Sequence, residues 1–317
     1  MITIGLDMMG GDFAPLEAAK GVGIFVSENI KAIHLVLIGD ESKINEILLT
    51  QPLPSQAYSI VHASQIIQMN EHATKALKEK PDSSIAVGFA LLASGKIDAF
   101  ISAGNTGAMM VGAIFSIKPI TGVLRPTIGA YMPREDGSLA LLLDVGLNAD
   151  CKADHLHQFA QLGSLFAEHI LQIPNPKVGL LNIGEEEGKG NLLAQAAYPL
   201  LKQNTTLNFI GNVEGRDILL NKADVIVCDG YTGNVVLKMA ESIFDITKRR
   251  KIEDEHFERF NFERYGGVPV LGVSKPVIIG HGISSAVAFK NMIHTAASML
   301  YTDLVGKIKA QFLQTSV

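Results

Sequence analysis

The chain has 317 residues, of which 47% are hydrophobic and 19% charged, and its formal net charge is −5. A chain of this length can bury roughly three quarters of its unfolded surface, so a large folded core is expected. The acidic balance excludes the basic footprint typical of nucleic-acid-binding proteins, and no window of about 18 uncharged apolar residues predicts a membrane-spanning helix.

Short apolar runs alternate with helix-period segments, which predicts β–α units wound into a mostly parallel sheet. In chain order, strands are expected at 2–6, 33–38, 59–62, 99–102, 127–132, 139–143, 177–182, 207–210, 225–228 and 277–279, and helices at 14–28, 41–49, 83–95, 106–116, 153–171, 191–203, 233–248 and 284–300. Asp136-Gly137 predicts an antiparallel hairpin over 127–143. Without a Pro/Ser-rich linker, residues 1–317 are expected to form a single α/β domain, in which any second lobe is built from interleaved segments.

Two cysteines, Cys151 and Cys228, are too few for a disulfide framework. The first residues also lack a basic stretch followed by an apolar run, so a reducing cytoplasm is the expected location. Cys228, at a strand end, is a conceivable acyl-thioester nucleophile, but free cysteines are more often small buried hydrophobes.

Six expected strands lead into polar, glycine-rich loops. These are DMMGGD (7–12), SAGNTGA (102–108), NIGEEEGKGN (182–191), GNVEGRD (211–217), CDGYTGNV (228–235) and GHGISS (280–285). The carboxyl ends of parallel strands share one edge of a sheet, so the loops are expected to converge there on a ligand. No metal is expected, because the candidate aspartates lack a recognisable ligand spacing; they are Asp7, Asp12, Asp144 and Asp229. No other cofactor is expected either.

Two of these loops share the pattern Gly-x-Thr-Gly, at 104–107 and 230–233. Glycines allow close approach of an anion, the threonine hydroxyl can donate a hydrogen bond, and the following helix offers free N–H groups. The pattern favours phosphate, although tight β–α turns alone would also need such glycines. The common nucleotide fingerprints fail. The P-loop pattern fails because Lys189 is followed by Gly190 instead of Ser or Thr, and G-x-G-x-x-G fails because GKGNLL ends in Leu193 and GHGISS ends in Ser285.

Lys189 lies between two glycines, which would present a cation to the predicted cleft or, in the alternative interpretation, to solvent alone. The preceding Glu185, Glu186 and Glu187 could orient Lys189, cap helix N-termini or accept a proton. His281 is the best placed of the nine histidines and is expected to stabilise a turn or contact the substrate.

Several long stretches together resemble the phosphate acyltransferases of bacterial phospholipid synthesis, the PlsX family. They are DMMGGDFAP, SAGNTGAMM, LLLDVGLNADCK, GLLNIGEEEGKGN, NFIGNVEGRDI, VCDGYTGNVVLK, YGGVPVLG and GHGISS. The resemblance implies a Rossmann-like three-layer fold similar to phosphotransacetylases and to isocitrate and isopropylmalate dehydrogenases, in a homodimer. It also implies that phosphate attacks the thioester of a long-chain acyl carrier protein, and that the acyl phosphate feeds a membrane glycerol-3-phosphate acyltransferase.

The resemblance assigns Lys189 and Asn234 as the catalytic pair. Substrate and phosphate contacts are expected from the loops, at Asp7, Gly10, Gly11, Gly104, Asn105, Thr106, Gly107, Glu187, Asn191, Asn212, Asp229, Thr232, Gly233 and His281. No covalent nucleophile is needed, because phosphate is itself nucleophilic.

The clearest departure from the family lies at 238–264, where a helical excursion for dimer, carrier-protein or membrane contact is expected. The segment is short and charged, and Lys248, Arg249, Arg250 and Lys251 are consecutive. They favour docking of the acidic acyl carrier protein, with anionic lipid or a solvated helix end as alternatives.

Three other functions remain open from the sequence. They are a short-chain phosphotransacetylase that uses acyl-coenzyme A, a β-decarboxylating NAD-dependent dehydrogenase, and a non-catalytic scaffold that recruits carrier protein to the membrane.

Overall fold

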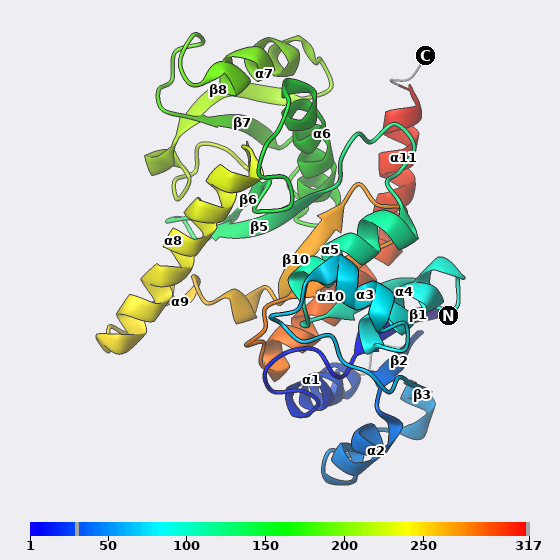
Figure 1. The fold of residues 1–317 in the computed structure, drawn as a ribbon. Coiled ribbons are helices and arrows are strands. Elements are labelled where there is room, and N and C mark those ends of the chain that lie inside the picture. The colour runs from blue at the N-terminus through cyan, green and yellow to red at the C-terminus, as the bar shows by residue number, and fades with distance from the viewer. Residues whose placement is uncertain (29–31, 315–317) are drawn as a thin grey trace. The chain divides into compact units, whose positions relative to one another are not determined.

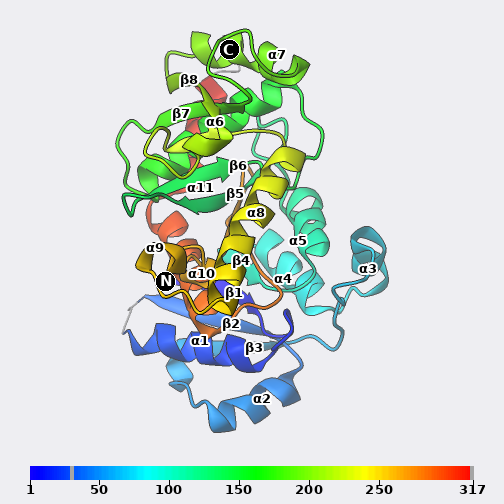
Figure 2. The same ribbon diagram turned by 90° about the vertical axis from the view of Figure 1, so that its left-hand side faces the viewer.

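A computed structural model describes residues 1–28 and 32–314 of the chain. The chain divides into two compact units, each assembled from two stretches of sequence. Unit 1 comprises Met1–Ile120 and Phe262–Val305, and unit 2 comprises Thr121–Asn261 and Gly306–Val317. Figures 1 and 2 show the elements of both units.

Unit 1 is built on a sheet in which only the last strand runs antiparallel to its neighbour. Its strands follow the spatial order β3 (Tyr58–His62), β2 (Ile33–Gly39), β1 (Ile2–Asp7), β4 (Ala99–Ser102), β11 (Val277–Gly280) and β10 (Gly267–Leu271). All four residues of β4 and of β11 are buried. Strands covered on both faces read as unbroken apolar runs, which is why the sequence predicts them well.

The helices of unit 1 pack around this sheet. They are α1 (Leu16–Ser27), α2 (Glu41–Thr50), α3 (Ala73–Glu79), α4 (Ser84–Ala93), α5 (Thr106–Gly112) and α10 (Ala286–Tyr301). In Figure 1, α1 and α10 lie side by side. Gly21 allows this close approach, because a Cβ at that position would lie 2.5 Å from the Phe289 Cβ.

Unit 2 has a five-stranded sheet. Its order is β5 (Thr127–Pro133), β6 (Leu139–Leu143), β9 (Val225–Val227), β7 (Lys177–Asn182) and β8 (Asn208–Glu214). β5 and β6 form the predicted antiparallel hairpin, while β6, β9, β7 and β8 are parallel. The hairpin prediction is confirmed, and Gly137 takes the left-handed φ of +88° at its turn.

The helices of unit 2 are α6 (Ala153–His169), α7 (Leu192–Gln203), α8 (Gly230–Arg249), α9 (Glu255–Glu258) and most of α11 (Leu304–Gln314). α6 packs closely on the sheet at Gly163, where a Cβ would collide with the side chains of Leu143 and Val225. The small residues of α6 therefore serve the core of unit 2.

The mixed α/β fold class and its mostly parallel sheet are confirmed. Among the strands and α-helices, four were not predicted individually: β10, α3, α9 and α11. The helix predicted at 106–116 is α5 followed by a π-helical turn, Ala113–Ile117. None of the helices in the described ranges is both long and apolar enough to cross a bilayer.

One predicted loop is wrong, because the first half of GNVEGRD belongs to β8. The pairing of β8 with β7 shifts register beside Val178, where Gly211 adopts φ of +95°. A bulge of this kind lets the strand continue, so Asn212 sits opposite Leu180 within the sheet. The loop proper is confined to the short 3-10 turn Gly215–Asp217.

Candidate active site

The six glycine-rich stretches of the sequence separate into two sets of three. Those at the carboxyl ends of β1, β4 and β11 belong to unit 1, and those at the carboxyl ends of β7, β8 and β9 belong to unit 2. Within each unit the strands are parallel, so the three stretches meet at one sheet edge. Convergence within each unit is confirmed, while a single cleft made by all six stays a prediction.

In unit 1, the buried carboxylate of Asp7 joins two of the loops. Its Oδ2 accepts the Ser102 hydroxyl at 2.6 Å, and its Oδ1 accepts the Met9 N–H at 2.9 Å. Ser102 Oγ in turn accepts the Gly104 N–H at 2.9 Å. Burial raises the pKa of the Asp7 carboxyl above its usual 3.8, although these hydrogen bonds lower it. Asp7 therefore holds the loops together from beneath.

Glycines at this edge allow the loop backbones to pack closely. A Cβ at Gly10 would lie 2.5 Å from Asp7 Oδ2 and 2.6 Å from the Gly104 N atom. Gly11 has φ of +98°, and the next residue, Asp12, donates its N–H to the Gly282 carbonyl at 2.7 Å. The loop that carries His281 thus joins the other two.

Asn105, the second residue of the first Gly-x-Thr-Gly loop, is the N-cap of α5. Its Oδ1 accepts the Ala108 N–H at 2.9 Å, while its Nδ2 donates to the carbonyls of Gln68 and Glu71 at 2.8 and 3.0 Å. Thr106 is exposed at the helix start. Phosphate contacts by Asn105, Thr106 and Gly107 stay predictions.

The second Gly-x-Thr-Gly loop is built differently, so the two are not structurally equivalent. Here α8 starts at Gly230, and Asp229 is its N-cap. Asp229 accepts the Thr232 N–H at 2.8 Å and the Thr232 hydroxyl at 2.9 Å. A carboxylate thus already occupies the helix N-terminus where phosphate was expected, and the threonine proton is already donated.

The glycines of the second loop serve close packing, which is the alternative interpretation of this motif. A Cβ at Gly230 would lie 2.6 Å from the Asn148 carbonyl oxygen, and one at Gly233 would collide with the Asp144 carbonyl oxygen. α8 therefore starts directly against the segment that follows β6.

Asn234 projects from the opposite face of α8 to Thr232 and Val236. Each residue of an α-helix is rotated by about 100° from the one before it, so Asn234 is turned by about 200° from both Thr232 and Val236. A Cβ at Gly146 would lie 3.4 Å from Asn234 Oδ1. Within the described ranges no hydrogen bond joins Asn234 to Lys189, so their joint catalytic role stays a prediction.

Lys189 lies in residues 183–190, here called the lysine loop. The Lys189 side chain is 53% exposed, and its Nζ stands 3.9 Å from Glu186 Oε1. The backbone is held more firmly, because the Asn182 amide donates to the Lys189 carbonyl at 3.1 Å. Gly190 must be glycine, since its φ is +96° and a Cβ would collide with the Asn182 side chain.

The two remaining glutamates pair with lysines outside the lysine loop. Glu185 pairs with Lys222 at 2.6 Å, and Lys222 also pairs with Asp217 at 2.7 Å. Glu187 pairs with Lys202 at 2.8 Å. Sequence reasoning missed these lysines, because Glu185 and Lys222 are 37 positions apart and no motif connects them.

Asn212 supports the lysine loop from inside. Its side chain is 4% exposed, and its Nδ2 donates to the Glu186 carbonyl at 2.8 Å. This bond makes Asn212 a positioning residue for the loop, while its contact with phosphate stays a prediction.

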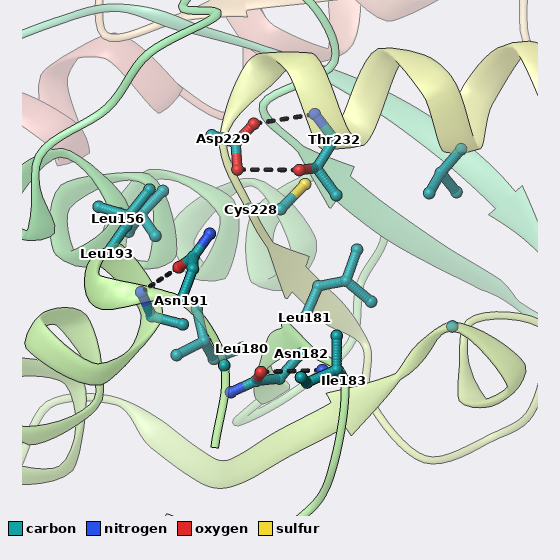
Figure 3. Close-up of a pocket in the computed structure, with 14 residues that line it drawn as sticks. Leu156, Leu180, Leu181, Asn182, Ile183, Asn191, Leu193, Cys228, Asp229 and Thr232 are labelled. Carbon is teal, nitrogen blue, oxygen red and sulfur yellow. Dashed lines mark hydrogen bonds between the residues drawn. The ribbon is translucent and has the colours of Figure 1, made fainter. Parts of the chain in front are cut away.

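A pocket of about 580 Å³ opens beside the lysine loop, within unit 2. Figure 3 shows its lining, which comes from β7, α6, α7, the start of α8 and Gly190. Of the predicted site residues, Asn191, Asp229 and Thr232 line it. Asn191 is the N-cap of α7 and accepts the Ala194 N–H at 2.8 Å.

Cys228 also lines this pocket, but its thiol is poorly suited to nucleophilic attack. The residue is 3% exposed, and burial raises the pKa of its thiol well above 9.0, helped by the nearby Asp229 and Asp144 carboxylates. The pKa of Cys151 is raised to about 11 by the same causes. Both thiols stay protonated near neutral pH, and a thiol is far less nucleophilic than a thiolate.

Comparison with known proteins identifies the family. A family model described as fatty acid synthesis protein matches residues 2–307. The phosphate acyltransferase of Dictyoglomus turgidum is 42% identical over 97% of this chain and 96% of its own. That of Desulforamulus reducens is 43% identical over 98% and 97%.

Solved structures agree on the fold. A phosphotransacetylase from Streptococcus pyogenes matches with a TM-score of 0.67, 17% identity and 94% coverage of each chain. The EutD phosphotransacetylase from Staphylococcus aureus matches with a TM-score of 0.64 at the same identity and coverage. Identity this low supports the fold alone. Together with the close relatives, which extend over nearly the whole chain, the family model shows that the chain belongs to the fatty acid synthesis protein family and is an acyltransferase enzyme of the phosphate acyltransferase type.

Proposed function

We propose that the chain transfers a long-chain acyl group from the thioester of an acyl carrier protein to inorganic phosphate, which gives acyl phosphate and free carrier protein. The observation that carries this proposal is the pocket beside the lysine loop. Gly190 lines that pocket and directly follows Lys189 in the chain, so we assign the acyl group to this largely apolar space and the phosphate to the lysine loop beside it.

The proposed reaction requires one substitution at the thioester carbon. A phosphate oxygen forms a bond to this carbon, the carbonyl oxygen carries negative charge in the tetrahedral intermediate, and the carbon–sulfur bond then breaks. The phosphate proton passes to the departing thiolate. Lys189 would bind phosphate and offset charge on the oxyanion, and such preorganised stabilisation is often the largest contribution to catalysis.

Direct attack by phosphate fits the chemistry of the pocket wall. A covalent acyl-enzyme would need a thiolate at Cys228, whose pKa is raised by burial. Asp229 faces the same pocket, and a second negative charge there would disfavour an anionic sulfur further. Phosphate bound outside the pocket, at the lysine loop, avoids both obstacles.

A short-chain phosphotransacetylase that uses acyl-coenzyme A is the second candidate, because it would catalyse the same attack of phosphate on a thioester. The size and apolar lining of the pocket favour a long chain over an acetyl group. Membership of the acyltransferase family removes the dehydrogenase alternative.

The deciding experiment compares palmitoyl-carrier protein with acetyl-coenzyme A in an assay for phosphate-dependent formation of acyl phosphate. Wild type should react with the first at least about a hundredfold faster, and Lys189→Ala should lose about two to three orders of magnitude. Lys75→Ala, an exposed lysine on α3 in unit 1, is the control. Equal rates for Lys189→Ala and wild type would reject the site, and a preference for acetyl-coenzyme A would reject the substrate.

We propose further that the acidic carrier protein docks on the basic cluster, defined as Lys248, Arg249, Arg250 and Lys251. All four residues are exposed at the C-terminal end of α8, and in the described part of the chain none of them forms an ion pair. The proposed setting is a cytoplasmic homodimer in phosphatidic acid synthesis, in peripheral contact with the membrane, where a glycerol-3-phosphate acyltransferase would consume the acyl phosphate.

A further inference from the structure

We propose that the pocket in unit 2 binds the acyl chain itself, with the thioester at the end formed by Gly190 and Asn182. This inference rests on the proposed function and names the part of the substrate that the pocket recognises. A phosphate-binding or pantetheine-binding role for the same pocket is the competing interpretation.

The apolar surface of the pocket comes from separate elements that meet in unit 2. Leu180 and Leu181 are on β7, Leu193 is on α7, Leu156 on α6 and Val236 on α8. Figure 3 shows Leu156 and Leu193 on one side of the space and Leu181 and Ile183 on another. Leu156 and Leu180 are buried, whereas Ile183 is exposed, so the pocket runs inward from the lysine loop.

The polar side chains of the lining are accounted for by the fold. Asn191 and Asp229 cap α7 and α8, and Thr232 donates its hydroxyl to Asp229. Asn182 accepts the Ile183 N–H at 2.8 Å and donates to the Lys189 carbonyl. Because each already serves a helix end or a loop, their presence does not indicate a polar ligand.

Charge also excludes phosphate from the interior. Asp229 is the ionisable carboxylate of the lining, and no lysine or arginine lines the pocket. An anion placed inside would meet this like charge with no positively charged side chain to offset it and only the partial charge at the start of α7, which is costly where water is partly excluded. The cation lies outside, at Lys189, one residue from Gly190. A neutral acyl chain inside the pocket avoids the charge of Asp229, and a phosphate at the mouth can pair with Lys189.

Two pairs of neighbouring residues provide matched tests. On α7, Leu193 lines the pocket whereas the adjacent Leu192 is 86% exposed. On α8, Val236 lines it whereas the adjacent Val235 is 53% exposed. Leu193→Trp and Val236→Phe should fill the space, and Leu192→Trp and Val235→Phe add the same bulk outside it.

The measurement is kcat/KM for octanoyl, dodecanoyl and hexadecanoyl thioesters. Each methylene held in the pocket should contribute about a factor of four, so losing space for two should cost roughly fifteenfold. Leu193→Trp and Val236→Phe should therefore lower the hexadecanoyl-to-octanoyl ratio at least about tenfold, while Leu192→Trp and Val235→Phe leave it within about twofold. An unchanged hexadecanoyl-to-octanoyl ratio would overturn the inference, whether kcat/KM falls equally for all chain lengths or does not fall at all.

A binding experiment separates this inference from the proposed function. Displacement of a fluorescent fatty acid by hexadecanoate requires no turnover, so it remains decisive if wild type makes no acyl phosphate. Weaker displacement with Leu193→Trp than with Leu192→Trp supports the acyl pocket. Identical displacement by both variants rejects it, even if acyl phosphate is formed.

Discussion

Glu186 is the one glutamate of the lysine loop that faces Lys189. The two side chains are 3.9 Å apart and mostly exposed, so solvent screens their attraction to about 1 kcal/mol or less. If Lys189 binds phosphate as proposed, Glu186 competes with phosphate for the same ammonium. Such a weak competitor would keep the lysine oriented in the free enzyme and yield to a doubly charged anion.

Glu186→Gln should therefore lower the KM for phosphate by up to about fivefold and change kcat little, because removing the competitor frees Lys189. Steady-state kinetics with varied phosphate would measure both constants. Glu79→Gln, on the surface of α3, removes one negative charge elsewhere and serves as the control. A higher KM for phosphate would mean that Glu186 holds Lys189 in its productive position.

Asp7 should make the stability of the protein depend on pH. Burial raises the pKa of its carboxyl above 3.8, so the folded chain keeps this proton at a higher pH than the unfolded chain does. Its contribution to stability is then fully present below about pH 4 and falls as the pH rises through the folded pKa. Asp7→Asn is neutral throughout and lacks this loss.

The unfolding free energy of Asp7→Asn relative to wild type should therefore increase between about pH 4 and pH 8. Urea unfolding at several pH values would measure this difference. A constant difference across the range would show that the carboxyl loses its proton at the same pH in both states.

At the scale of elements, the start of α8 shows how one motif can have two structural roles. Gly233→Ala should destabilise unit 2 by about 1–3 kcal/mol or more, since its Cβ would collide with the Asp144 carbonyl and displace the helix. Gly188→Ala should be neutral or stabilise by up to about 1 kcal/mol, since open space surrounds that position. Guanidinium unfolding of both variants tests the contrast, and a destabilising Gly188→Ala would contradict it.

The sequence predicted most strands because buried parallel strands appear as unbroken apolar runs. It missed β10, where Gly266-Gly267 and Pro269 resemble a loop, and the antiparallel pairing with β11 keeps that segment in the sheet. It predicted the site loops from their glycines. The pairing of Lys222 with Glu185 could not be predicted, because it depends on how unit 2 folds.

At the scale of the whole molecule, the basic cluster is where a local charge opposes the net charge of −5. Long-range steering depends on such local charge and weakens as salt rises. Replacing all four residues by glutamate should raise the KM for acyl-carrier protein at least about tenfold and leave the KM for the same acyl-coenzyme A within about twofold.

Initial rates at varied carrier concentration, at low and high salt, would test this docking. The effect of the reversal should shrink at high salt. An unchanged dependence on carrier concentration would reject the cluster as the docking site, and an equal change with acyl-coenzyme A would indicate general damage to the enzyme.

The lysine loop is held by contacts that do not involve its own ammonium. Asn212, Asn182, Lys222 and Lys202 each bind another part of it, so its backbone should keep its shape when the Lys189 side chain is removed. Chemical rescue requires that the site left empty by the Lys189 side chain keeps its shape. Methylammonium added to Lys189→Ala should restore part of the activity in a saturable manner, whereas Lys189→Ala combined with Asn212→Ala should respond to the same amine weakly or not at all.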